Sequence, residues 1–184
     1  DVIDAMIRQP FSSQTRPFKA HLITNKANIN AADYDLGKNG YAYLDSDTAN
    51  YHISTGKRSS GNRGGAYRND GVDISKSKRG YENYYVTNIE DGEWLQYTID
   101  VADEGKYKVK LRVASEKEDG KISILNGSNN LAKNVSVPNT GHSEKWQTID
   151  VEDLALHKGQ NSLRIFFEKG GFNLADIQLD RSSK

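Results

Sequence analysis

The sequence predicts an all-β fold, a sandwich or barrel built from antiparallel strands. From Tyr84 onward, short runs rich in Tyr, Val, Ile, Thr and Phe recur between clusters of Gly, Asn and Asp. The run from Lys106 to Val113 alternates basic and apolar residues, which places one face of a strand against a core and the other in water. These strand-forming runs leave little of the chain for helices.

Eight strands are predicted in this part of the chain, each bounded by residues that favour turns. They are expected near residues 84–88, 94–101, 107–114, 121–125, 132–137, 147–151, 162–168 and 172–179. The dipeptides expected to reverse the chain are Asp119-Gly120, Asn126-Gly127, Pro138-Asn139, Lys158-Gly159 and Gly170-Gly171. The stretch 45–79 is polar, yet it holds residues spaced as buried anchors: Tyr51, Tyr67, Val72 and Ile74. We therefore expect ordered loops there, around one or two short strands, rather than disorder.

Composition excludes several classes of protein. A chain of 184 residues suits a single domain, and we assign residues 1–26, with two of the 3 prolines, to a linker and extended lead-in and residues 27–184 to the sandwich. The 25 basic and 25 acidic residues give a net charge of +0, which predicts no attraction to nucleic acid or acidic membranes. With no cysteine there is no disulfide and no thiol nucleophile. Short apolar runs and the absence of a signal peptide predict a soluble chain, already processed or cut from a longer protein.

Catalytic motifs are not found in the sequence. It has no phosphate-binding loop of the P-loop type and no nucleophile elbow. The histidines lack the spacing of metal ligands: His21, His52, His142 and His157. Glu90, Asp91 and Glu93 come nearest to the carboxylate pair of a glycosidase, but neighbours in one turn point to different sides. A solvated turn is therefore favoured over catalysis there.

Aromatic residues favour a binding function. The chain has 10 Tyr and 2 Trp, and flat rings stack on sugar faces while amides and carboxylates hydrogen-bond hydroxyls. Trp146 follows the polar loop 142–145 and precedes a predicted strand, so it is either a core cap or a stacking platform. Trp94 lies inside a predicted strand, where burial in the core is favoured.

Blocks distributed along most of the chain after residue 27 occur in the order of a known family. They are Ala31–Gly37, Gly61–Arg68, Gly71–Ile74, Asp91–Tyr97, Gly105–Ser115, Trp146–Thr148 and Gly170–Leu174. Together they resemble carbohydrate-binding module family 6. The resemblance implies a two-sheet antiparallel β-sandwich of the jelly-roll type. It also implies a secreted or extracellular protein in which the module is covalently linked to a catalytic domain, a glycoside hydrolase or lyase that acts on plant or algal wall polysaccharides.

The resemblance further implies two possible sugar clefts. The loop cleft has a pair of aromatic residues, an Asn and often a Glu, and by position Trp146 is one aromatic and Asn173 is the Asn. The other two positions carry Asn88 instead of an aromatic residue and Ser75 instead of Glu. Asn88 and Asn173 are expected to hydrogen-bond sugar hydroxyls.

Either a substitute ring completes the loop cleft, or the cleft has changed its ligand or weakened. The nearest candidates for that ring are Tyr67, Tyr84 and Tyr85. Trp94 matches an aromatic residue of the second cleft, which lies on the concave face of a sheet, so that cleft is an alternative.

Many members of the family hold a structural calcium ion between acids near the start and end of the fold. Here Ala32 and Ala175 occupy acid positions, which argues against a site. Asn30, Asp33 and Asp176, with backbone carbonyls, could still supply the oxygen ligands that calcium requires. No cofactor is expected to be required.

The leading hypothesis is a non-catalytic module that binds a β-galactan such as agar, a β-glucan or xylan and targets an attached glycoside hydrolase to it. A structural spacer with a decayed sugar site and a small glycan hydrolase or lyase are the alternatives. Arginines in the long loops add sulfated or acidic algal glycans as candidate ligands: Arg58, Arg63, Arg68 and Arg79. Surface salt bridges are the favoured explanation of these arginines. One stacking ring and a few hydrogen bonds, each about 0.5–1.5 kcal/mol, predict micromolar-to-millimolar affinity.

Overall fold

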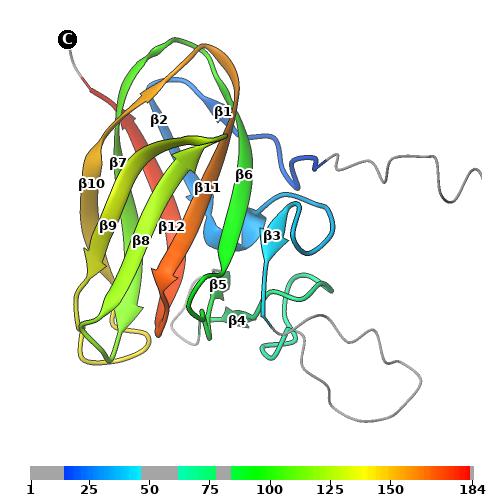
Figure 1. The fold of residues 1–184 in the computed structure, drawn as a ribbon, viewed down its shortest axis with the longest axis vertical. Coiled ribbons are helices and arrows are strands. Elements are labelled where there is room, and N and C mark those ends of the chain that lie inside the picture. Colours follow the sequence, from blue (N-terminus) through cyan, green and yellow to red (C-terminus); the bar gives the residue numbers. More distant parts are fainter. Residues whose placement is uncertain (1–14, 47–61, 78–83, 183–184) are drawn as a thin grey trace, which may run out of the picture.

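The computed structural model describes residues 15–46, 62–77 and 84–182, which form a β-sandwich with one short 3-10 helix (Figure 1). The elements are β1 (Leu22–Ile23), β2 (Lys26–Asn30), η1 (Ala31–Asp33), β3 (Tyr43–Leu44), β4 (Ile74–Lys76), β5 (Tyr84–Val86), β6 (Trp94–Val101), β7 (Gly105–Ser115), β8 (Gly120–Asn126), β9 (Asn129–Val137), β10 (Gln147–Leu156), β11 (Gly159–Lys169) and β12 (Phe172–Arg181). No helix in these ranges is long and apolar enough to cross a membrane.

The strands form two sheets that pack face to face. The first, here called the β6 sheet, has the order β1-β6-β11-β8-β9, with β3 also paired to β6. The second, the β12 sheet, has the order β10-β7-β12-β5-β4, with β2 paired to β12. Most consecutive strands from β6 to β12 cross from one sheet to the other, which is the jelly-roll arrangement. The predicted two-sheet antiparallel sandwich is confirmed, with the short β1 running parallel to β6 as a local addition.

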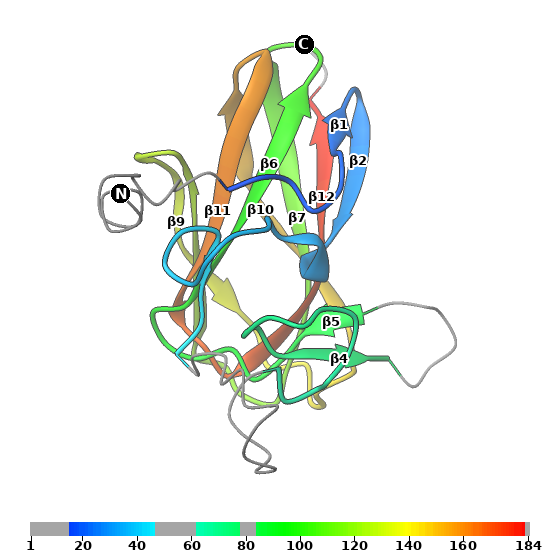
Figure 2. The same ribbon diagram turned by 90° about the vertical axis from the view of Figure 1, so that its right-hand side faces the viewer.

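The eight predicted strands correspond one to one to β5 to β12. β4 is a short strand expected within the polar stretch. The strands β1 to β3 were not predicted, because two to five residues are too few to show a period. Residues 1–26 were assigned to a lead-in, yet β1 pairs with β6 and Arg16 exchanges backbone hydrogen bonds with Leu36. The sandwich therefore extends back beyond residue 27, and Figure 2 shows this segment crossing β6 before it enters β1.

The core lies between the sheets and follows the predicted alternation. Tyr107, Val109, Leu111 and Val113 of β7 are at most 1% exposed, while the lysines between them face water. The facing residues of the β6 sheet include Tyr97, whose hydroxyl donates to the carbonyl oxygen of Ala31 at 2.8 Å. Burial of these side chains is the main force that holds the sheets together.

Two glycines at the predicted strand junctions also let chains approach closely. Gly120 is the first residue of β8, and a Cβ atom there would lie 2.8 Å from the Phe172 ring. At Gly170 a Cβ atom would lie 2.1 Å from the carbonyl oxygen of Ile89. Both positions join the strands to the loops at one end of the sandwich, where the candidate site lies.

Candidate functional site

β4, β5 and the loop before β10 lie at the same end of the sandwich (Figure 1, Figure 2), and β5 and this loop carry an aromatic pair. The rings of Tyr85 and Trp146 are in edge contact, with centroids 5.1 Å apart and planes at 70°. Tyr85 lies on β5, and Trp146 is the residue immediately before β10. We call the group around this pair the Trp146 cluster: Tyr85, Arg112, Glu144, Trp146 and Asn173.

Strand alternation and one anchored loop bring these residues together. Val86 pairs with Leu174 on the core side of the β12 sheet, so Tyr85 points to the other side of β5. The loop 138–146 is held at Thr140, whose hydroxyl donates to the Ser115 carbonyl oxygen at 3.0 Å and accepts from the Ser115 amide at 2.9 Å. Both groups are buried at the end of β7, so the loop that carries Trp146 has a defined position.

Polar groups surround the pair. The Asn173 side-chain amide donates to the Ser143 carbonyl oxygen at 2.7 Å, and no described residue donates to its Oδ1 atom. The Tyr85 hydroxyl donates to Glu144 Oε1 at 3.3 Å. Burial, and after it the charge of the Glu144 carboxylate, raises the pKa of the Tyr85 phenol, so it stays a neutral donor. The Arg112 guanidinium lies 5.5 Å from the Trp146 ring centre and forms an ion pair with Asp176.

Exposure differs between the two rings. Tyr85 and Asn173 are each 7% exposed, whereas Trp146 is only partly buried. Tyr85 therefore buttresses Trp146 from the side instead of standing apart as the second wall of a clamp. The arrangement offers one ring for stacking, with an amide oxygen and a carboxylate beside it.

The other two tyrosine candidates lie in a separate group. Tyr67 and Tyr84 stack on each other, with ring centroids 4.4 Å apart. The Tyr67 hydroxyl donates to Asp33 at 2.5 Å, and the Lys19 ammonium lies 5.3 Å from the Tyr67 ring centre. Because Tyr84 and Tyr85 alternate along β5, the structure brings Tyr85 to Trp146 and turns Tyr84 away.

Asn88, which stands where a second aromatic residue was expected, is exposed and lies two residues beyond β5. Its φ of 48° is left-handed, a conformation that asparagine tolerates better than most residues. The next residue, Ile89, accepts a hydrogen bond from the Gly171 amide at 2.8 Å, which places this loop beside the start of β12. Sugar binding by Asn88 stays a prediction.

A carboxylate does reach the cluster, from the loop before β10 instead of from the expected position in β4. Ser75, at the expected Glu position, lies opposite Tyr85 in the β4–β5 pair. Glu144, in the loop before β10, makes the hydrogen bond with the Tyr85 hydroxyl. The signal available in the sequence was the position of Glu144 two residues before Trp146 in a polar loop.

Trp94 is 7% exposed, but it is not part of the core between the sheets. Its neighbour Leu95 faces the core, so Trp94 lies on the outer face of the β6 sheet. The Arg164 guanidinium covers it, 3.7 Å from the centre of the ring. Trp94 therefore does not present an open ring for stacking.

The acids near Trp94 have structural partners. Glu93 accepts hydrogen bonds from the amides of Ser46 and Glu90, both at 2.9 Å. Asp91 accepts from the Gly170 amide at 2.8 Å. These bonds fix the loop before β6, in keeping with a turn rather than with a catalytic pair.

The candidate calcium ligands also have other partners. Asn30 caps η1 by accepting from the Ala32 amide at 2.9 Å, and its side-chain amide donates to the Tyr84 carbonyl oxygen at 2.8 Å. Asp33 pairs with Lys19 at 3.0 Å, and Asp176 pairs with Arg112. In the described ranges no three His, Asp or Glu side chains form a group that could hold a metal ion. Two of the three candidate ligands are thus carboxylates that already face cations.

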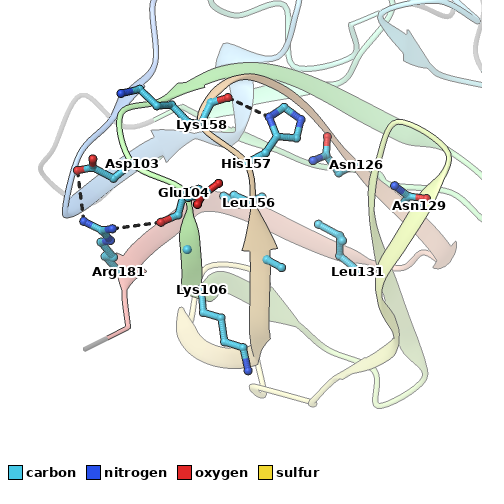
Figure 3. Close-up of a pocket in the computed structure, with 12 residues that line it drawn as sticks. Asp103, Glu104, Lys106, Asn126, Asn129, Leu131, Leu156, His157, Lys158 and Arg181 are labelled. Atoms are coloured by element: carbon cyan, nitrogen blue, oxygen red, sulfur yellow. Dashed lines mark hydrogen bonds and ion pairs between the residues drawn. The ribbon is translucent and has the colours of Figure 1, made fainter. Parts of the chain in front are cut away.

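A hollow of about 950 Å³ lies at the opposite end of the sandwich (Figure 3). It is formed by the turns that join β6 to β7, β8 to β9 and β10 to β11, together with Arg181. Arg181 pairs with Asp103 at 3.3 Å across its edge. The hollow is lined by charged, polar and aliphatic residues and by the His157 imidazole (Figure 3), but by no Tyr, Trp or Phe, so it lacks the large ring on which a sugar face would stack.

Comparison with curated proteins gives partial matches. Over 93 residues the chain is 33% identical to the clotting factor G alpha subunit of Tachypleus tridentatus, a match that covers 50% of this chain and 14% of the relative. Over 57 residues it is 39% identical to beta-agarase AgaA of Microbulbifer thermotolerans, covering 31% of this chain and 13% of the relative. The matched segments thus span about a seventh of the length of these relatives.

Solved structures show the same fold. The C-terminal family 6 module of LamC, a marine laminarinase from Zobellia galactanivorans, superimposes with a TM-score of 0.62 at 23% identity, over 85% of this chain and 100% of that chain. A module of Cellvibrio mixtus lichenase 5A, solved with cellotriose, gives a TM-score of 0.55 at 24% identity, over 61% of this chain and 88% of that one. The family model for carbohydrate binding module family 6 matches residues 66–181, more than half of the 184 residues. The chain belongs to family 6 of the carbohydrate-binding modules, a family of non-catalytic binding modules.

Proposed function

We propose that this chain binds a neutral β-linked polysaccharide at the Trp146 cluster and carries out no reaction on it. The observation that carries the proposal is the partly exposed Trp146 ring, which is buttressed by Tyr85 and lies on the loop to which Asn173 is hydrogen-bonded at Ser143. The apolar face of a pyranose ring would stack on the indole, and a sugar hydroxyl would donate to Asn173 Oδ1. The Glu144 carboxylate is a second acceptor at the edge of the site.

The names of similar proteins support a class of ligand. They include an agarase, a laminarinase and a lichenase module solved with cellotriose. These names favour a β-galactan such as agar or a β-glucan as the ligand class, and xylan stays the third candidate. With one ring and a few hydrogen bonds of about 0.5–1.5 kcal/mol each, binding should lie in the micromolar-to-millimolar range.

We further infer that the module belongs to an exported bacterial enzyme and targets an attached glycoside hydrolase or lyase to its substrate. Two observations support this: the curated relatives are much longer than the matched segments, and the structural relatives come from a laminarinase and a lichenase. No cofactor is needed for the proposed binding, and calcium at Asn30, Asp33 and Asp176 stays a prediction.

The test is affinity electrophoresis of the purified chain through gels that contain agarose, laminarin, mixed-linkage glucan or xylan. We expect at least one polysaccharide to retard migration, relative to albumin in the same gel and to the chain in a gel without polysaccharide. If none does so up to saturating polysaccharide, the structural-spacer alternative replaces this proposal. Incubation with the same polymers is expected to release no new reducing ends or unsaturated products, and their appearance would show catalysis.

A further inference from the structure

The Trp146 cluster holds one carboxylate without a counterion. Glu144 forms no ion pair with any residue in the described ranges. The Arg112 guanidinium, which lies 5.5 Å from the centre of the Trp146 ring, is paired with Asp176, and this pair compensates its charge. Glu144 therefore leaves the surroundings of the ring with a net negative charge.

Two lysines in the loops at this end of the sandwich lie against glycines and do not pair with Glu144. The ammonium nitrogen of Lys145 lies beside Gly141, where a Cβ atom would be 4.0 Å from it. The ammonium nitrogen of Lys117 lies beside Gly171, at the same distance from a Cβ atom there. Both lysines are exposed, so water screens their charges more than that of the partly buried Glu144.

Hydrogen bonds give the Glu144 carboxylate a defined position. The Tyr85 hydroxyl donates to Oε1 at 3.3 Å, and the Glu144 backbone amide donates to Nδ1 of His142 at 3.1 Å. The Tyr85 ring is itself in edge contact with Trp146, with centroids 5.1 Å apart. The carboxylate therefore lies near the ring on which a sugar would stack.

Most donor groups of the cluster already face protein acceptors, whereas two acceptor atoms do not face a donor. The donors with protein partners are the Tyr85 hydroxyl, the Asn173 side-chain amide and the Arg112 guanidinium. No described residue donates to Glu144 Oε2 or to Asn173 Oδ1. A ligand that completes these hydrogen bonds must therefore donate to the cluster.

Free sugar hydroxyls meet this requirement. A hydroxyl that donates to a carboxylate forms a charge-assisted hydrogen bond, about twice as strong as one between neutral groups. A sulfate ester or a uronate carboxylate offers only acceptor atoms, and its charge is repelled by a nearby carboxylate. Sulfation of a sugar hydroxyl thus removes a favourable contact with Glu144 and adds an unfavourable one.

We propose that Glu144 is a specificity-determining residue, through which the Trp146 cluster selects sugar units with free hydroxyls and excludes units that carry a sulfate or carboxylate group. Glu144 Oε2 accepts from one sugar hydroxyl and Asn173 Oδ1 from another, with the sugar ring stacked on Trp146. The inference rests on the proposed function and deepens it, because it adds a charge criterion to the class of ligand. It decides against sulfated and acidic glycans as ligands of this site.

The test is quantitative affinity electrophoresis in laminarin, agarose, mixed-linkage glucan and xylan, each compared with a chemically sulfated derivative of the same polymer. At low salt the wild type should bind the neutral polymer at least about tenfold more tightly than its sulfated form. Glu144→Gln keeps the shape of the side chain and removes its charge, so it should bind the neutral polymer more weakly and the sulfated form more tightly. The ratio of the two affinities should fall at least about fivefold.

The matched control is Glu118→Gln, which removes a carboxylate from an exposed position in the loop between β7 and β8, outside the cluster. It should keep both affinities within about twofold of the wild type. Tyr85→Phe is a second variant, which releases the Glu144 carboxylate but keeps its charge. In this variant neutral binding should weaken while the sulfated polymer stays excluded. Near-ultraviolet circular dichroism checks that all three variants fold.

Three outcomes would overturn the inference and leave the proposed function in place, because the neutral polymer is still bound. They are equal wild-type affinities for the neutral and sulfated forms, an unchanged ratio in Glu144→Gln, and an equal fall of the ratio in Glu118→Gln. The last would show general charge repulsion. A lack of retardation by every neutral polymer would contradict the proposed function and the inference together.

Discussion

Trp146→Ala is expected to weaken binding of the neutral polysaccharide at least tenfold, which corresponds to about 1.4 kcal/mol. The Trp146 ring is the only partly exposed aromatic surface of the described cluster, because Tyr85 is 7% exposed and supports it from the side. Removing the ring takes away the stacking contact with the sugar face. Isothermal titration calorimetry or quantitative affinity electrophoresis gives the affinity.

The matched control is Tyr41→Ala. Tyr41 is an exposed aromatic residue, 47% accessible, in the loop before β3 and outside the cluster. It should leave the affinity within about twofold of the wild type. If Tyr41→Ala and Trp146→Ala weaken binding equally, or if neither does, the assignment of the site to Trp146 is wrong.

Gly170→Ala should destabilise the fold by about 2–3 kcal/mol, the upper part of the range for overpacking substitutions. A Cβ atom at residue 170 would lie 2.1 Å from the Ile89 carbonyl oxygen and 2.8 Å from the Glu90 carbonyl carbon, both backbone atoms that cannot rotate away. Relief requires the loop before β6 to move. For a domain of this size the expected fall in Tm is about 5–10 °C, measured by differential scanning calorimetry.

Gly127→Ala separates steric conflict from simple loss of glycine. Gly127 has φ 57° and no atom within 4 Å of the added Cβ, so only the left-handed conformation is penalised. The expected cost is about 1–2 kcal/mol, with a correspondingly smaller fall in Tm. Equal Tm values for the two variants would mean that the close approach of residue 170 to Ile89 adds no steric cost to the substitution.

The fold was predictable because its strands are long enough to show their period. The alternation from Tyr107 to Val113 places one face in the core, and every residue of that face is buried. β1 and β3 have two residues each and are strands only because β6 offers them an edge. The close packing at Gly120 was also beyond prediction from the sequence. Its partner Phe172 is 52 positions away in the chain, and a dipeptide pattern indicates only local turns.

The site was predictable in part. Trp146 and Asn173 follow from position within the family pattern, and the structure brings them to one cluster with Tyr85. The choice of Tyr85 over Tyr84 requires knowing which side of β5 meets the core, and that depends on pairing with β12. Glu144 reaches the cluster because Thr140 anchors its loop to Ser115, a long-range contact.

Arg164 illustrates the same point on the other face. In the sequence it is a charge that interrupts an apolar strand, the usual sign of a solvated face. Its contact with Trp94 depends on the register between β6 and β11, in which Gln96 pairs with Arg164 and Trp94 with Phe166. The covered Trp94 could not be inferred without that register.

The most direct test of the central claim is intrinsic fluorescence, because the chain has only 2 tryptophans. In Trp94→Phe, Trp146 is the sole tryptophan, and titration with laminarin, or with the neutral polysaccharide that gives the strongest retardation, should shift its emission to shorter wavelength and saturate. In Trp146→Phe, where only Trp94 remains, the same titration should give no shift. A saturable shift confined to Trp146→Phe would contradict the account and place neutral sugar binding on the outer face of the β6 sheet.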